Sequence, residues 1–120
     1  AFAVAPIAAG TASSQRKAVL DALRPAVEAK LGPNVEFVVQ VIRVEDGWAF
    51  VMADPQRRRG KPIDGKRIFG EDFENMDGLR VDAVLQLKNG SWEVVDYGIG
   101  ATDVWYCNIG PKKLKRGYGC

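Results

Sequence analysis

Residues 79–97 read LRVDAVLQLKNGSWEVVDY, and this stretch decides the fold. Apolar and polar side chains alternate along its first half, which is typical of a β-strand with one buried face. Asn89-Gly90 follows directly, and this pair tolerates the positive φ angles of a two-residue type I′ turn. The stretch therefore predicts a β-hairpin.

The register of this hairpin singles out one carboxylate. A two-residue turn sets Asp96 opposite Ala83, on the side that carries Leu85 and Val94. A carboxylate against an apolar wall has a raised pKa and can act as a general acid or base, or hold a polar ligand. The alternative interpretation is a strand-end carboxylate that accepts hydrogen bonds from the amides of residues 98–102.

Residues 35–53 predict a second hairpin, because VEFVVQVIRV is rich in β-branched residues and is followed by EDGW. A three-residue turn with Gly47 in the left-handed region sets Ile42 opposite Phe50. A two-residue turn sets Arg43 there instead. We favour the three-residue turn because it pairs an aromatic with an aliphatic side chain.

An amphipathic helix precedes both hairpins. Its apolar residues recur every four positions, at Val19, Leu23, Val27 and Leu31. Ser13 or Ser14 can cap its start, and Gly32-Pro33 ends it. Pro25 lacks an amide for the helix, so we expect a kink or two abutting helices there. One helix followed by two hairpins predicts an α+β fold, with the helix packed across a four-stranded antiparallel meander.

The first strand of this sheet is apolar on both sides. One row holds Phe37, Val39 and Val41, and the other holds Val38, Ile42 and Val44. A meander covered by a single helix has one wet face, so the second row needs a cover. The candidates are the 56–78 segment, residues 104–107, and a second copy of the chain in a homodimer.

The 56–78 segment is long for a connection and combines glycines with charges. It predicts a functional loop, a flexible loop, or a loop with a short extra strand at residues 67–69.

Composition excludes several function classes. The chain has 120 residues, enough for one domain, and a net charge of +2, too little to indicate nucleic-acid binding. It has no histidine, which excludes Ser/His/Asp and Cys/His chemistry, and two cysteines alone cannot complete a structural zinc site. No Gly-rich phosphate loop is present. We therefore predict no metal, no cofactor and no nucleic-acid partner.

Cys107 and Cys120, with twelve residues between them, are predicted to form a structural disulfide, and the alternative is a pair of unpaired thiols. A redox pair is disfavoured because the Cys-x-x-Cys spacing is lacking. A structural disulfide indicates a periplasmic or secreted protein. The small-residue leader, residues 1–12, resembles the end left by signal-peptide cleavage, and residues 13–120 are predicted to form the single domain. No apolar run reaches the roughly 18 residues of a membrane span.

Two groups of residues are candidates for binding. The first combines aromatic side chains with carboxylates, which suits a recognition surface: Asp96, Tyr97, Asp103, Trp105 and Tyr106. In the alternative interpretation Thr102 or Asp103 caps a short turn and Trp105 fills the core. The second group consists of two basic clusters, which can bind anionic groups or be simply solvated: Arg57, Arg58, Arg59 and Lys61, and Lys112, Lys113, Lys115 and Arg116.

The chain resembles a group of small secreted proteobacterial proteins. The segments that carry the resemblance are 16–24 (RKAVLDALR), 35–43 (VEFVVQVIR), 47–51 (GWAFV), 85–95 (LQLKNGSWEVV) and 98–105 (GIGATDVW). The helix-then-meander layout of that group is similar to the cystatin-like and ketosteroid-isomerase-like cone folds. The resemblance implies this fold and no particular activity.

These observations favour a non-enzymatic domain that binds a protein partner or a small ligand. One alternative is a cone-fold isomerase with Asp96 as general base and Tyr97 or Tyr106 as hydrogen-bond donor. A second is a peptidase inhibitor of cystatin shape, in which the turn at residues 45–47 and the leader form one wedge.

Overall fold

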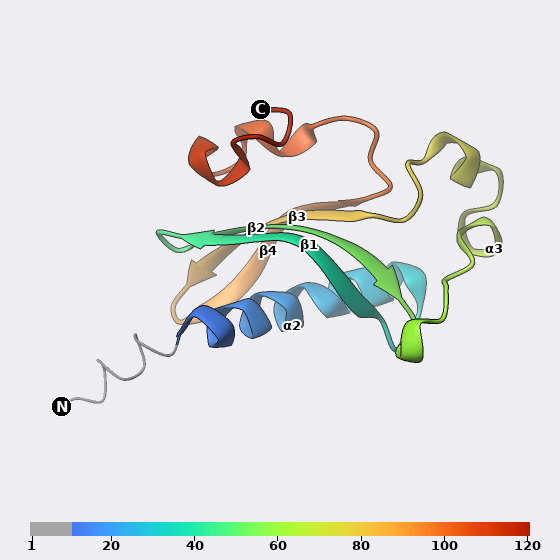
Figure 1. Cartoon of the computed structure of the whole chain (residues 1–120), viewed down its shortest axis with the longest axis horizontal. Helices are drawn as coiled ribbons and strands as arrows, with labels where there is room; N and C mark the ends of the chain where they lie inside the picture. Colours follow the sequence, from blue (N-terminus) through green and yellow to red (C-terminus); the bar gives the residue numbers. More distant parts are fainter. Residues whose placement is uncertain (1–10) are drawn as a thin grey trace.

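The fold packs one long helix against one face of a single sheet, as Figure 1 shows. The computed structural model describes residues 11–120. The elements are α2 (Thr11–Leu31), β1 (Glu36–Glu45), β2 (Trp48–Gln56), α3 (Gly65–Phe69), β3 (Val81–Lys88) and β4 (Ser91–Ile99). The strands lie in the order β1-β2-β3-β4, and each pairs with its neighbour antiparallel. The predicted α+β helix-plus-meander architecture is therefore confirmed.

The turn between β3 and β4 has the predicted geometry. Lys88 pairs with Ser91, so only Asn89 and Gly90 form the turn. Both residues have positive φ angles, 51° and 81°, as a type I′ turn requires.

The predicted position of Asp96 is wrong, because β4 contains a bulge at Val95. Leu85 pairs with Val94, but the next pair is Val84 with Asp96. One extra residue moves every following side chain to the opposite face of the sheet. Asp96 therefore lies opposite Val84, and Tyr97 takes the place opposite Ala83.

The three-residue turn between β1 and β2 is also wrong. Glu45 pairs with Trp48 across a two-residue turn, which sets Arg43 opposite Phe50. Backbone carbonyl oxygens near the C-terminus accept hydrogen bonds from this guanidinium. Arg43 Nη1 donates to the carbonyl oxygens of Leu114 (3.3 Å) and Arg116 (3.0 Å). Cross-strand pairing alone could not show this partner, which lies more than 70 residues away in the sequence.

A second bulge, at Gln40, divides β1. Val39 pairs with Ala53, but Val41 pairs with Met52. The predicted row of Phe37, Val39 and Val41 is therefore wrong, because Val41 lies on the opposite face and packs against a different core.

The first core lies between α2 and the sheet. The buried residues of α2 are the four of the predicted stripe, Val19, Leu23, Val27 and Leu31. The helix begins at Thr11, before the predicted caps, and it continues through Pro25 as one element, so two abutting helices are excluded. Gly32 ends it with a φ of 93° and donates its N–H to the Glu28 carbonyl (2.8 Å).

The second core lies on the opposite face of the sheet, under the C-terminal segment (residues 104–120) (Figure 1). Its buried members are Phe50, Val84, Tyr106 and Leu114. The ring centroids of Phe50 and Tyr106 are 4.8 Å apart. The predicted second row of Val38, Ile42 and Val44 is also wrong, because Ile42 and Val44 pack against the first core and Val38 is 48% exposed. Of the three candidate covers for the second face of the sheet, the segment that contains residues 104–107 provides it.

A disulfide closes the C-terminal segment. Cys107 and Cys120 are bonded, with Cα atoms 5.4 Å apart, as predicted from the sequence. Among the described residues, no helix is both long and apolar enough to cross a bilayer.

Residues 62–78 form an arm that projects from the end of the sheet (Figure 1). The short strand predicted at residues 67–69 is wrong, because α3 occupies this region. Asp64 caps α3 by accepting a hydrogen bond from the Arg67 N–H (3.1 Å). Ile63 and Phe69 pack against the first core and hold the arm in place.

We expect Leu114→Ala to reduce the free energy of unfolding by about 2–5 kcal/mol, because it leaves a cavity in the second core. Chemical denaturation measures this loss. The control is Val38→Ala, which truncates a side chain that is 48% exposed and should have a much smaller effect. Equal effects would show that the C-terminal segment contributes no core.

Candidate functional site

Asp96 and Tyr97 lie on opposite faces of the sheet. Asp96 is exposed, and its Oδ1 accepts a hydrogen bond from the Tyr97 N–H (2.9 Å). Tyr97 points toward α2 and donates its hydroxyl proton to the Ala26 carbonyl (3.2 Å). The two side chains are therefore not brought together.

Trp105 and Tyr106 face inward, in the second core. Tyr106 is buried and donates its hydroxyl proton to the Tyr118 carbonyl (2.7 Å), and burial raises the pKa of this phenol. Trp105 packs over Gly98, where a Cβ would lie 3.0 Å from the indole Nε1. Trp105 packs into the core, as the alternative interpretation predicts, while Asp103 is exposed. The predicted cap is wrong, because Val104 precedes the turn at Trp105–Asn108 and no side chain caps it.

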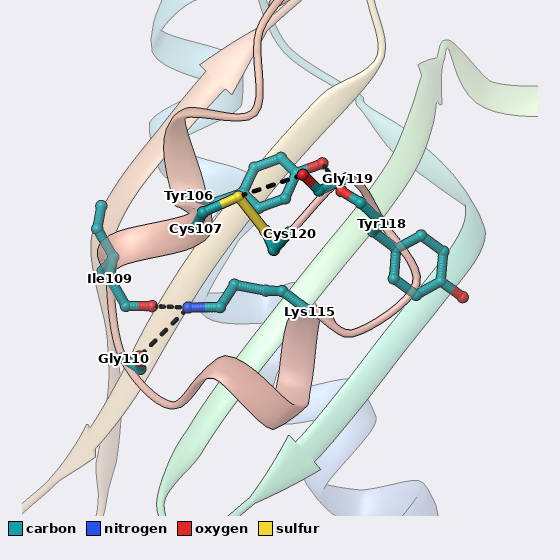
Figure 2. The surroundings of a disulfide bond; sticks show 8 residues. All are labelled: Tyr106, Cys107, Ile109, Gly110, Lys115, Tyr118, Gly119 and Cys120. Carbon is teal, nitrogen blue, oxygen red and sulfur yellow. Dashed lines mark hydrogen bonds between the residues drawn. A yellow bond between two sulfur atoms is a disulfide. The ribbon is translucent and has the colours of Figure 1, made fainter.

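The second basic cluster is divided by the fold, and Figure 2 shows the surroundings of its buried member, Lys115. Lys115 is fully buried, and its Nζ donates to the carbonyl oxygens of Ile109 and Gly110. Lys113 Nζ pairs with Asp46 (2.6 Å) and lies 3.8 Å from Glu45. Only the remaining two members, Lys112 and Arg116, are exposed and lack a carboxylate partner within residues 11–120.

One buried ion pair was missed by sequence reasoning. Asp82 is fully buried on the face of the second core and accepts hydrogen bonds from Arg80 Nε (3.0 Å) and Nη2 (3.4 Å). Burial raises the pKa of Asp82, and the Arg80 guanidinium opposes this shift. The available signal was the i,i+2 spacing, which places both side chains on one face of a strand.

Arg57, from the first basic cluster, has a structural role at the end of α2. Its Nη1 donates to the Pro33 carbonyl (2.9 Å), and its Nη2 donates to the Leu31 carbonyl. Gly32 leaves room for this contact, since a Cβ there would lie 3.3 Å from Nη2. The guanidinium therefore neutralises the partial negative charge of the helix C-terminus.

The other three cations of this cluster, Arg58, Arg59 and Lys61, are exposed on a tight turn. We call residues 57–61 the basic turn. The Arg57 N–H donates to the Lys61 carbonyl (2.8 Å), and Arg59 has a φ of 63°. A left-handed conformation is uncommon for a residue other than glycine, and strained positions cluster at functional sites.

The basic turn borders a hollow of about 330 Å³, lined by Asn34, Arg57, Arg58, Arg59 and Lys61. Among the described residues, no carboxylate pairs with Arg58, Arg59 or Lys61. The side chains around this hollow thus supply several cations and no acid. Such a site can hold a carboxylate, phosphate or sulfate group.

Two further hollows adjoin this one. The second hollow, of about 430 Å³, is lined by Arg57, Pro62, Asp64, Arg67 and Ile68. The third hollow, of about 300 Å³, is lined by Arg24, Glu28, Asn34, Val35, Glu36 and Arg58. The hollow at the basic turn shares Arg57 with the 430 Å³ hollow, and it shares Asn34 and Arg58 with the 300 Å³ hollow.

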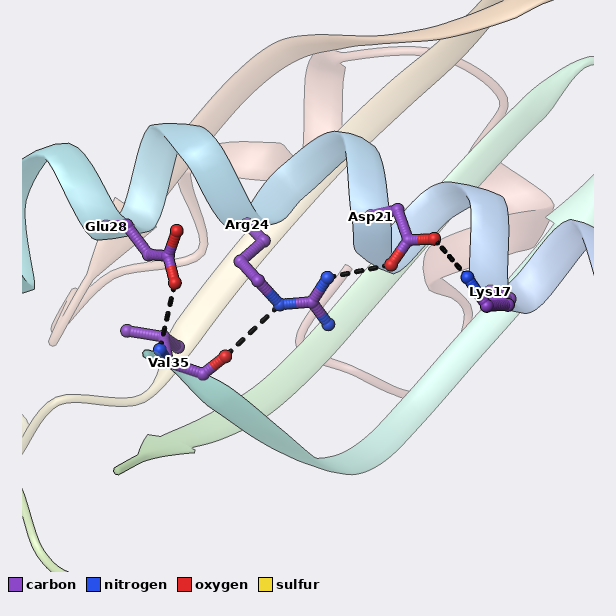
Figure 3. A network of polar contacts seen from close by, with 5 residues as sticks. All are labelled: Lys17, Asp21, Arg24, Glu28 and Val35. Carbon is purple, nitrogen blue, oxygen red and sulfur yellow. Dashed lines mark hydrogen bonds and ion pairs between the residues drawn. The ribbon is translucent and has the colours of Figure 1, made fainter. Parts of the chain in front are cut away.

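The charges on α2 near the third hollow are already engaged (Figure 3). Arg24 donates to Asp21 (2.7 Å) and to the Val35 carbonyl (3.1 Å). Glu28 accepts from the Val35 N–H (2.9 Å). Hydrogen bonds from Lys17 and Arg24 lower the pKa of Asp21. This network fastens the start of β1 to α2 and occupies the charges of Arg24 and Glu28.

We expect Tyr97→Phe to cost about 1 kcal/mol of stability, because it removes a half-buried hydrogen bond to Ala26. Asp96→Asn should change the free energy of unfolding by less than about 0.5 kcal/mol, since the carboxylate is exposed. Thermal unfolding of the two variants measures the difference. A larger loss for Asp96→Asn would place the carboxylate inside, as the sequence predicts.

Burial and the nearby Lys112 ammonium lower the pKa of Lys115 below its usual 10.5. Between these two pKa values the unfolded chain binds more protons than the folded chain, so the stability that Lys115 contributes rises with pH. We expect the wild type to gain stability relative to Lys115→Met as the pH rises toward the usual lysine pKa of 10.5. Urea denaturation of both proteins tests this, and a constant difference would contradict it.

Comparison with known protein families, curated proteins and solved structures finds no match to this chain. The resemblance to secreted proteobacterial proteins therefore stays a prediction. The helix-plus-meander fold and the basic turn are what the structure itself establishes.

Proposed function

We propose that this protein is a non-catalytic domain that binds an anionic ligand at the basic turn. One observation carries the proposal: Arg58, Arg59 and Lys61 surround one hollow without a carboxylate partner in residues 11–120. Like charges held together repel each other, and an anionic ligand would relieve that repulsion.

Arg57 supports this proposal although its own guanidinium is already engaged. The C-terminus of a helix repels anions, and α2 ends beside the hollow. Because Arg57 binds the Leu31 and Pro33 carbonyls, it covers that negative end and adds a fixed positive wall. The two neighbouring arginines are then available for two-pronged contacts with a carboxylate or phosphate.

The alternative functions have less support. The isomerase hypothesis needs Asp96 in a pocket with Tyr97 or Tyr106, but Asp96 is exposed, Tyr97 faces α2, and Tyr106 lies beneath the C-terminal segment. The inhibitor hypothesis needs the leader beside the turn at residues 45–47. Residues 1–10 lie outside the described residues, so that hypothesis stays a prediction.

The disulfide supports a periplasmic or secreted location as part of the proposal. Disulfide bonds persist in oxidising compartments and are rare in the cytosol. Cys120 is exposed, so a reducing environment would reach the bond.

The test is a titration with a short polyglutamate peptide and, separately, inorganic phosphate, followed by amide chemical shifts. We expect the largest shifts at residues 57–61. In Arg58→Ala with Arg59→Gly, glycine accepts the positive φ at residue 59. Losing two charge-assisted contacts should weaken binding at least about tenfold.

The control variant is Lys112→Ala with Arg116→Ala, which removes two exposed charges from the C-terminal segment. It should weaken binding by less than about twofold at physiological salt, because distant surface charges are screened. Equal losses in the two variants would show non-specific attraction and would contradict a site at the basic turn. Amide chemical-shift changes that occur only outside residues 57–61 would contradict this site as well.

A further inference from the structure

We infer that the anionic ligand is an acidic peptide segment with an aliphatic side chain beside its carboxylates, bound across the two hollows that share Arg57. This inference rests on the proposed function and adds the chemical class of the partner.

The two hollows lie at a fixed spacing. Arg57 forms a wall of both, and its guanidinium is held by the Leu31 and Pro33 carbonyls. It therefore cannot swing out of the way without exposing the end of α2. A ligand that occupies both hollows must therefore extend across Arg57, with its binding groups separated by the distance between the two hollows.

The second hollow differs in chemistry from the first. Its carboxylate, Asp64, already accepts a hydrogen bond at the start of α3. Its apolar lining is Pro62 and Ile68, and Ile68 is 36% exposed although it is a large hydrophobic residue. The Arg67 side chain stands beside them without a carboxylate partner among residues 11–120.

The chemistry of the residues that line the two hollows specifies the ligand. An anion fits the basic turn, an aliphatic group fits against Pro62 and Ile68, and a second anion fits Arg67. Neighbouring residues of a peptide place such groups within a few ångströms of one another. Planar carboxylates also match the guanidinium fork of arginine.

Other anions match only part of this surface. Inorganic phosphate uses the first hollow alone. An acidic glycan would present sugar rings, and neither lining includes an aromatic side chain on which a ring could stack. An anionic membrane would meet Glu71, Asp72 and Glu74, which follow α3 on the arm and are exposed. A peptide is narrow enough to avoid these acids.

The experiment uses fluorescence anisotropy with a labelled peptide that contains Glu-Glu-Leu-Glu, and with the same peptide carrying Ser in place of Leu. We expect the Leu peptide to bind at least about threefold more tightly, because it buries apolar surface against Ile68. Ile68→Thr should remove this difference. The matched control, Val95→Thr, changes a residue that is 44% exposed on β4 and should preserve it.

Competition assays complete the test, using a sulfated oligosaccharide and, separately, vesicles that contain an anionic lipid. Equal binding of the two peptides, with Arg58→Ala/Arg59→Gly still weakening both, would overturn the inference and leave the proposed function standing. Tighter binding of the oligosaccharide or the vesicles, unaffected by Ile68→Thr, would overturn it in favour of that ligand. If Arg58→Ala/Arg59→Gly weakened the binding of no probe, both the inference and the proposed function would be overturned.

Discussion

The structure depends on burying both faces of one four-stranded sheet. Helix α2 covers one face, and the C-terminal segment covers the other with Tyr106 and Leu114 against Phe50 and Val84. A segment with so little regular structure leaves many backbone carbonyls to satisfy. Lys115 and Arg43 donate to four of them, and the disulfide ties the last residue to the start of the segment. Arg43 on β1 and Lys115 in the C-terminal segment are thus engaged in internal hydrogen bonds, although the sequence alone shows Lys115 as part of a basic cluster.

This arrangement separates Asp96, Tyr97 and Tyr106, which the isomerase hypothesis would need in one pocket. The bulge at Val95 turns Asp96 to solvent and Tyr97 toward α2, while Tyr106 lies under the C-terminal segment. The aromatic residues that suggest recognition are largely core residues, since an inward-facing ring contributes more by packing than an exposed one. The candidate site therefore moves from the aromatic residues to the basic turn, which follows β2 and lies beside the C-terminal end of α2.

The charges of the chain fall into two classes according to their partners. Arg57, Lys113 and Lys115 hold carbonyl or carboxylate oxygens of the protein itself. Arg58, Arg59 and Lys61 meet no acid in the described part of the chain, and they share one hollow. The two basic clusters look equivalent in the sequence, but only the first gathers its available cations around one hollow. Unsatisfied charge, rather than charge density, is what distinguishes a candidate binding surface here.

By itself the sequence determined the helix stripe from Val19 to Leu31, the turn at Asn89-Gly90, the meander and the disulfide, because each depends on short-range periodicity, local φ preferences or the only available cysteine pair. The tertiary structure decided the bulges at Gln40 and Val95, the partner of Arg43 and the burial of Lys115. These features depend on contacts between distant segments, which stabilise the protein only once the chain has folded. A bulge of one residue reverses the faces of a strand, so a correct hairpin still led to an incorrect position for Asp96.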